Sequence, residues 1–177
     1  ALLAVGDPYI EEYVGSMVTI MDTEWGAVKC AMGEAVSIGP QAFGKLPGSY
    51  VILAVPPVSP SNDDVDWDDE VEKGQGESTD SLHYLQMGLR STIRGCFQTI
   101  KAKTANSVEA IGIPTITTKP SNSSEVYHTC LNIVLETIIE ESKLTNLKAV
   151  YLLASSGEEA KTLIKSASEL GLAIASS

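Results

Sequence analysis

The chain has 177 residues, of which 44% are apolar and 20% charged, a composition typical of a globular domain with a hydrophobic core. Twelve basic and 23 acidic residues give a formal net charge of −11 and a pI near 4.5. This charge disfavours nucleic-acid binding and polybasic membrane attachment, because both depend on clustered lysine and arginine. The longest mainly apolar stretch, 50–58, is far shorter than the roughly 20 residues of a membrane-spanning helix.

The cysteines and residues 1–5 bear on the cellular compartment in which we expect the protein. Cys30, Cys96 and Cys130 are odd in number and widely spaced, which fits neither a disulfide framework nor a zinc site. Residues 1–5 are apolar but lack the charged region and cleavage site of a signal peptide. We therefore expect a cytoplasmic or nuclear protein, with no membrane segment, metal or cofactor.

Apolar periodicity predicts an alternation of strands and helices. Short apolar runs between Gly- and Pro-rich turns are typical of strands, and apolar residues at i, i+3 and i+4 are typical of helices. Asp80 or Ser81 is placed to cap the first long helix, and Gly171 to end the last one. In chain order the predicted elements are strands 34–38 and 50–55, helix 81–104, strand 107–114, helix 125–142, strand 147–154 and helix 157–170, with a possible short strand at 172–176.

The segment 58–80 interrupts this alternation. Between Asp63 and Asp80 it carries nine carboxylates against one lysine, Lys73. So much like charge and so few apolar groups predict a solvated loop insertion. A calcium site is the alternative, but the spacing lacks the central glycine and the twelfth-position glutamate of an EF-hand loop. Trp67 in this segment is a candidate anchor for a protein partner.

The order of the elements predicts the architecture. Strands alternating with helices imply right-handed crossovers and a mostly parallel sheet with helices on both faces. Strand 147–154 is nearly all apolar, as expected for a strand covered on both faces. We therefore expect one α/β domain over 1–177, a three-layer α/β/α sandwich whose mixed, mostly parallel sheet includes 50–55, 107–113 and 147–153.

Ligands of open α/β sheets bind where strands end and loops enter helices. The loop 115–124 combines hydroxyls, an amide and a lysine, and it runs directly into a predicted helix, an arrangement that suits a phosphate. The alternative is that Ser123 or Ser124 simply caps that helix, and the local chemistry leaves both interpretations open. His83 and His128 fall on predicted helices without a metal-ligating residue at i+3 or i+4, and the common phosphate-loop, dinucleotide, zinc-protease and hydrolase motifs do not occur.

Four segments in order resemble a macro domain, the ADP-ribose-binding α/β module, closest to those in tandem in poly-ADP-ribose-polymerase-linked proteins. MGEAV at 32–36 is similar to the family's T-G-E-A strand opening, and KLPGSYVILAVPP at 45–57 to L-P-x-K-Y-I-I-H-x-V-G-P. IGIPTITT at 111–118 resembles I-A-F-P-A-I-S-T, and NLKAVYLL at 146–153 resembles the last core strand. The resemblance implies a macro-like fold and an ADP-ribose or ADP-ribosylated protein ligand.

The departures from the family bear on function. The family's glycine-rich phosphate loop corresponds to Lys-Pro-Ser-Asn at 119–122, where Pro120 removes a backbone donor. Leu53 and Pro56 replace the family's His and Gly. Residues 1–13 are similar to the helix that follows the family's N-A-A-N strand, and that strand is not found upstream. The chain therefore either lacks the N-terminal strands of the domain or has dispensed with them.

The resemblance and the departures together imply a non-hydrolytic ADP-ribose reader, or a pseudo-domain in which ADP-ribose binding is weakened or lost. One alternative is a protein-interaction module that uses the acidic loop or another surface, and a second is an ADP-ribosyl hydrolase. We expect no catalytic residue. The candidate ligand-binding residues are Thr117, Thr118, Lys119, Ser121, Asn122 and Ser123, with Val55 and Ser155 in the neighbouring loops.

Overall fold

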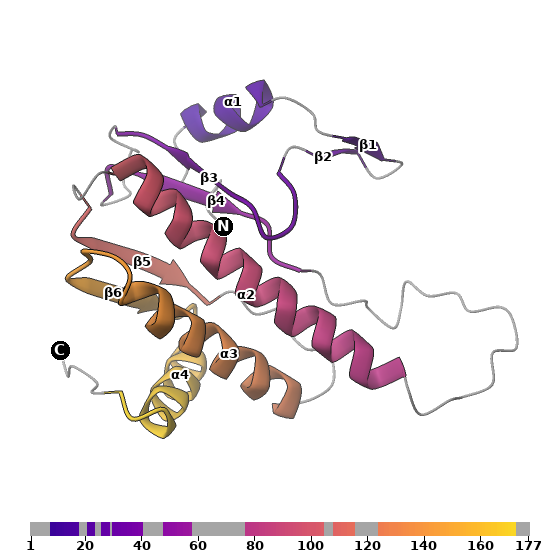
Figure 1. Ribbon diagram of the computed structural model, residues 1–177, viewed down its shortest axis with the longest axis vertical. Helices are drawn as coiled ribbons and strands as arrows, with labels where there is room; N and C mark the ends of the chain where they lie inside the picture. Colours follow the sequence, from indigo (N-terminus) through magenta and orange to yellow (C-terminus); the bar gives the residue numbers. More distant parts are fainter. Residues whose placement is uncertain are drawn as a thin grey trace, which may run out of the picture.

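A computed structural model describes residues 8–17, 21–23, 26–28, 30–40, 48–57, 77–104, 108–115 and 124–172. Its elements confirm the predicted α/β class (Figure 1). In chain order they are α1 (Pro8–Ser16), β1 (Met21–Thr23), β2 (Gly26–Val28), β3 (Ala35–Ile38), β4 (Val51–Ala54), α2 (Glu77–Thr104), β5 (Ala110–Pro114), α3 (Ser124–Ser142), β6 (Ala149–Leu153) and α4 (Gly157–Glu169).

The predicted strands and helices between 34 and 170 are present, with corrections at their ends, whereas the possible strand at 172–176 lies almost entirely outside the described residues. Helix α2 begins at Glu77, so Asp80 and Ser81 lie within the helix and do not cap it. The acidic composition of 77–80 favoured assigning these residues to the loop, although acidic residues are favourable in the first turn of a helix. The helix stop at Gly171 is confirmed, since this glycine adopts a φ of 73° and Leu172 N donates to Ala167 O at 3.0 Å.

The strand pairing differs from the predicted sheet. In the described residues β3 and β4 form an antiparallel pair, β1 and β2 form another, and only β5 and β6 pair in parallel. We expected 50–55 to share one mostly parallel sheet with 107–113 and 147–153. In the described residues this is wrong, because β4 forms hydrogen bonds only with β3. Apolar periodicity indicates which face of a strand is buried but not which strand lies beside it. The pairing of the strands could therefore not be predicted from the pattern.

The β3–β4 hairpin is the middle of three layers. Ile38 and Val51 lie opposite each other and pack with Ile10 of α1 on one face. Helix α2 covers the other face, where Thr99 Oγ1 donates to Ala35 O at 3.1 Å. Figure 1 shows the hairpin between these two helices. The predicted sandwich of helices around a sheet is thus present at this hairpin.

Small residues let α2 approach the hairpin closely. A Cβ added to Gly95 would lie 2.4 Å from Gly33 O, and one added to Gly88 would lie 2.7 Å from Pro57 Cβ. Between them, Thr92 Oγ1 donates to Val55 O at 3.1 Å and to Gly88 O at 2.9 Å, and its side chain is fully buried. The stripe Gly88, Thr92, Gly95 and Thr99, at i, i+4, i+7 and i+11, is therefore the contact line of α2 on the hairpin.

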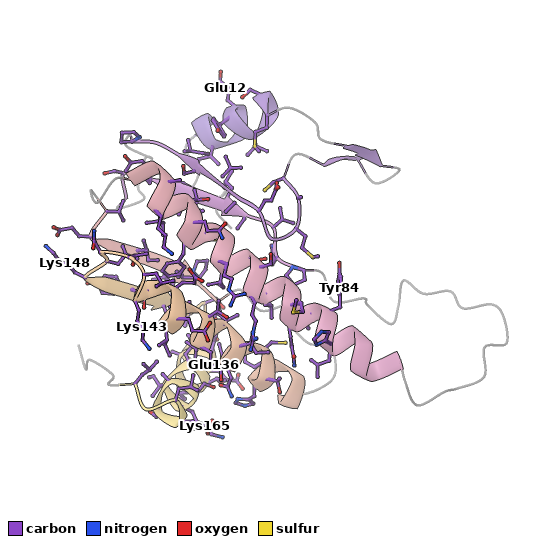
Figure 2. All side chains as sticks on the ribbon, viewed as in Figure 1. Glu12, Tyr84, Glu136, Lys143, Lys148 and Lys165 are labelled. Atoms are coloured by element: carbon purple, nitrogen blue, oxygen red, sulfur yellow. The ribbon has the colours of Figure 1, made fainter. Side chains whose placement is uncertain are left out.

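The opposite side of α2 builds the main core with α3 and the β5–β6 pair. Its residues combine the predicted stripe of α2 with Ile113 and the inner face of α3. Exposed ion pairs such as Arg90–Glu136 at 3.8 Å border this core, and Figure 2 shows Glu136 on α3. Such pairs contribute little stability, so apolar burial holds the two helices together. The core residues are Leu85, Leu89, Ile93, Phe97, Ile113, Cys130, Val134 and Ile138.

The second face of the β5–β6 pair is open in the described structure. Ile111 and Ile113 face the core, whereas Ala110, Gly112 and Pro114 on the alternate positions are exposed. On β6 the side chains of Tyr151 and Leu153 are 60% and 52% exposed. The expectation that 147–154 is covered on both faces is therefore wrong for β6. Among the described helices, none has the length and apolarity needed to cross a membrane.

Candidate functional site

The parallel strands β5 and β6 end at one edge of their sheet, where the predicted site loops begin. Thr115 follows β5 directly, and its backbone N–H donates to Leu153 O, the last residue of β6, at 3.2 Å. Six of the candidate residues, Thr117, Thr118, Lys119, Ser121, Asn122 and Ser123, lie outside the described residues. Whether they bind a ligand or cap α3 therefore stays a prediction, and the described part of the site consists of the ends of the strands.

Ser155, the candidate residue after β6, is bound by a glutamate. Its backbone N–H and its hydroxyl both donate to Glu159 Oε2, at 2.5 and 2.7 Å. The other carboxylate oxygen of Glu159 accepts a hydrogen bond from Thr115 Oγ1. One carboxylate in the first turn of α4 thus joins the residues that follow β5 and β6.

The sequence contains a signal for Glu159, although this residue is not among the predicted site residues. Ser156 is the N-cap of α4, and its hydroxyl accepts from Glu159 N at 3.2 Å. Ser156 and Glu159 therefore have the S-x-x-E spacing of a capping box, in which the glutamate returns to the backbone N–H of the cap. Here the glutamate reaches one residue further back, to Ser155 N, and across to Thr115. The capping box is visible in the sequence, but the contact with β5 is not, since 44 residues separate the two positions.

Val55, the candidate residue after β4, contributes through its backbone. Its carbonyl oxygen accepts from Gly33 N at 3.3 Å and from Thr92 Oγ1 at 3.1 Å. Its side chain is 37% exposed. The carbonyl of Val55 thus fixes the end of β4 to α2 and to the turn before β3. Only the exposed side chain of Val55 is available for contact with a ligand.

The titratable residues of the described structure do not form a metal centre. No group of three or more His, Cys, Asp or Glu residues lies close enough to hold a metal ion in the described ranges. His83 is exposed on α2, and the His128 ring lies edge-on to Tyr127 with centroids 6.2 Å apart. Burial, with a smaller contribution from Cys30, raises the pKa of Cys96 to about 11. Cys96 is therefore a protonated, weakly reactive thiol at neutral pH.

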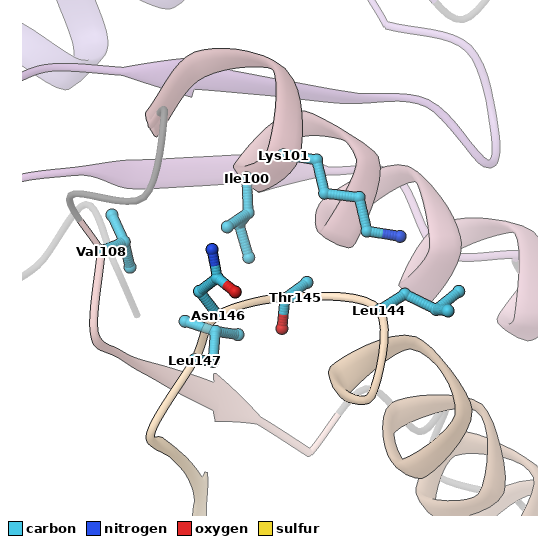
Figure 3. Close-up of a pocket in the computed structure, with 7 residues that line it drawn as sticks. All are labelled: Ile100, Lys101, Val108, Leu144, Thr145, Asn146 and Leu147. Atoms are coloured by element: carbon cyan, nitrogen blue, oxygen red, sulfur yellow. The ribbon is translucent and has the colours of Figure 1, made fainter.

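A small pocket lies at the opposite end of β5 and β6 (Figure 3). It is enclosed by the end of α2, the residue Val108 before β5 and the turn 144–147 before β6. Its volume is about 120 Å³, well below the roughly 300–1,000 Å³ of typical ligand sites. Its position at the amino ends of the strands also separates it from the predicted site.

Comparison with known proteins identifies the fold. The sequence matches no family model, and no curated protein matches it either. Among solved structures, a mutant of the Oceanobacillus iheyensis macrodomain has a TM-score of 0.64 and 16% identity, over 96% of this chain and 74% of its own. Another mutant of that macrodomain, with ADPR, has a TM-score of 0.52 and 19% identity, over 82% of this chain and 63% of its own.

The macro domain of ganglioside induced differentiation associated protein 2 has a TM-score of 0.57 and 16% identity, over 93% of this chain and 64% of its own. Identities this low establish the fold alone. The chain spans between 60% and 74% of the length of the macrodomain structures compared with it here. The structural likeness confirms the macro fold that the four sequence segments predicted, and the particular resemblance to poly-ADP-ribose-polymerase-linked macro domains stays a prediction.

Proposed function

We propose that this chain, which has the macrodomain fold, is an ADP-ribose-binding module that binds its ligand weakly and does not hydrolyse ADP-ribosyl bonds. The observation that carries the proposal is the structural likeness to the Oceanobacillus iheyensis macrodomain, which has been solved with ADPR. Ligands of open α/β sheets bind at the carboxyl ends of the strands. This supports placing the ligand at the ends of β5 and β6, next to the loop that contains Thr117 to Ser123.

Weak binding follows from the residues of that loop. A backbone that wraps a diphosphate needs several N–H donors and close approach, for which glycine is best suited. Lys119 and Pro120 stand where the resembling family has glycine-rich sequence, and proline has no N–H to donate. Lys119 offers one point charge in exchange. We propose that the replacement of glycine by Lys119 and Pro120 removes most of the affinity for ADP-ribose and that the charge of Lys119 retains a small part of it.

The absence of hydrolysis is proposed from the same edge of the sheet. Hydrolysis requires a positioned water and a group that accepts its proton. Glu159 is the carboxylate at the described end of β5 and β6, and its oxygens already accept hydrogen bonds from Thr115 and Ser155. This engagement supports a structural rather than a catalytic role for Glu159.

The test is calorimetric titration of the protein with ADP-ribose, together with an assay for release of ADP-ribose from a modified protein. The proposal expects saturable binding with one site and no release. Saturable binding with release would identify a hydrolase. Complete absence of binding would favour a protein-interaction module, for which the exposed side chains of Tyr151 and Leu153 are the supporting observation.

A further inference from the structure

We infer that Glu159 is a positioning residue that holds the ends of β5 and β6 together beside the proposed ligand site, and this inference rests on the proposed function. Its carboxylate joins Thr115, directly after β5, to Ser155, two residues after β6, through Thr115 Oγ1, Ser155 N and Ser155 Oγ. Thr115 lies two residues before Thr117, the first candidate ligand-binding residue between β5 and α3. The carboxylate therefore fixes Thr115, at the end of β5, relative to the end of β6.

The geometry distinguishes this role from ordinary helix capping. A capping glutamate needs only the backbone N–H of its own N-cap, and Ser156 already supplies the reciprocal contact to Glu159 N at 3.2 Å. The hydrogen bond from Thr115 is not needed to begin α4, because Thr115 belongs to a different strand end. Its effect is to tie that strand end to α4. Hydrogen bonds to a charged group are the stronger ones, so this hydrogen bond resists separation of the two strand ends.

The negative charge of Glu159 acts in the opposite direction. A carboxylate close to a bound phosphate repels it, and removal of the charge would then strengthen binding. Three donors share this charge, which reduces the field that reaches a ligand. We expect loss of position to outweigh loss of repulsion, so that removing the carboxylate weakens ADP-ribose binding.

The decisive variants are Glu159→Ala and Glu159→Gln, with Glu158→Ala as the matched control. Glu158 is the exposed neighbour in the same first turn of α4, so its removal changes the net charge and the helix end in the same way. Glu159→Ala should weaken ADP-ribose binding about ten-fold, the scale of one hydrogen bond to a charged group. Glu159→Gln should weaken it as well, because its NH₂ group cannot accept from the donors. Glu158→Ala should change it by about two-fold at most.

A double-mutant cycle separates positioning from general stability. Thr115→Val removes the hydroxyl and keeps the shape of the side chain. If Glu159 acts through Thr115, Thr115→Val weakens ADP-ribose binding, and adding it to Glu159→Ala weakens binding no further. A merely structural Glu159 would lower the melting temperature and leave the affinity of the folded protein unchanged, which would overturn the inference. Tighter binding by both Glu159 variants would also overturn it, in favour of repulsion.

Amide hydrogen exchange on the same proteins tests the role of Glu159 independently of whether the protein binds ADP-ribose. Glu159→Ala should speed exchange at Thr115 and Ser155, whereas the amide of Ile113, inside β5, should exchange as in the unmodified protein. If neither the unmodified protein nor any variant binds ADP-ribose, the proposed function fails. The exchange rates then still test whether Glu159 holds the two strand ends together. Unchanged rates at Thr115 and Ser155 would show that it does not.

Discussion

At the scale of single residues, the contact between α2 and the β3–β4 hairpin requires the missing side chain of Gly95. A methyl group there would meet the backbone oxygen of Gly33 at 2.4 Å, and a backbone atom cannot rotate away as a flexible side chain can. We expect Gly95→Ala to lower the free energy of unfolding by about 1–3 kcal/mol, the usual cost of overpacking. The gain in helix propensity from alanine is smaller than this cost.

The matched control is Gly15→Ala in α1, where an added Cβ meets no atom within 4 Å. This substitution should leave the free energy of unfolding unchanged or raise it by up to about 1 kcal/mol. Urea denaturation of both variants measures the difference. Equal stabilities for Gly95→Ala and Gly15→Ala would show that α2 does not approach the hairpin as described.

Cys96 gives the protein a dependence on alkaline pH. Burial raises the pKa of this thiol from an ordinary 9.0 to about 11, and the charge of nearby Cys30 adds to the shift. The folded state therefore holds the proton more tightly than the unfolded state. The contribution of Cys96 to stability is complete below about pH 9 and is lost as the pH rises through about 11. Denaturation of the protein and of Cys96→Ala between pH 8 and pH 11 should show a steeper loss of stability with Cys96 present. Parallel curves would contradict the assignment.

At the scale of elements, the acidic segment is the part that we expect to be dispensable. Residues 62–76 lie outside the described structure, so their role stays a prediction from composition. Few apolar side chains in this segment are available to offset the entropy of ordering it. Deletion of 62–76 should leave the melting temperature nearly unchanged in differential scanning calorimetry. A large drop would mean that Trp67 or the carboxylates pack against the body of the protein.

The helices could be predicted more fully than the sheet. The periodicity of α2 marks the residues of its core side, and seven of the eight core residues named above lie on α2 and α3. The second contact line of α2, Gly88 to Thr99, was missed because glycine and threonine do not register as an apolar stripe. Strand pairing and the contact between Thr115 and Glu159 join residues far apart in the chain, and no local pattern encodes such pairings. The position of the candidate site at the ends of β5 and β6 stays a prediction, and Glu159, which joins the two strand ends, was not foreseen from the sequence.

At the scale of the whole molecule, the protein combines a macrodomain fold with the sequence Lys-Pro-Ser-Asn at 119–122, where the resembling family has a glycine-rich phosphate loop. In this fold the carboxyl ends of β5 and β6 lie at one edge of their sheet, and Glu159 connects these two strand ends. We propose that residues 117–123 determine how tightly this edge of the sheet binds ADP-ribose. If Lys119 contacts a ligand phosphate, Lys119→Ala should weaken binding by about 1–2 kcal/mol, the scale of a charge-assisted hydrogen bond. Isothermal titration calorimetry measures this loss.

The ratio of ADP-ribose affinities between the unmodified protein and the pair Lys119→Gly/Asn122→Gly shows whether the loop limits binding. This pair returns glycine to the loop at two positions. We predict weak binding by the unmodified protein and about ten-fold tighter binding by the pair, since each recovered backbone donor contributes on the order of 1 kcal/mol. Tight binding by the unmodified protein that is lost on Lys119→Ala, or no binding by either protein, would contradict this prediction.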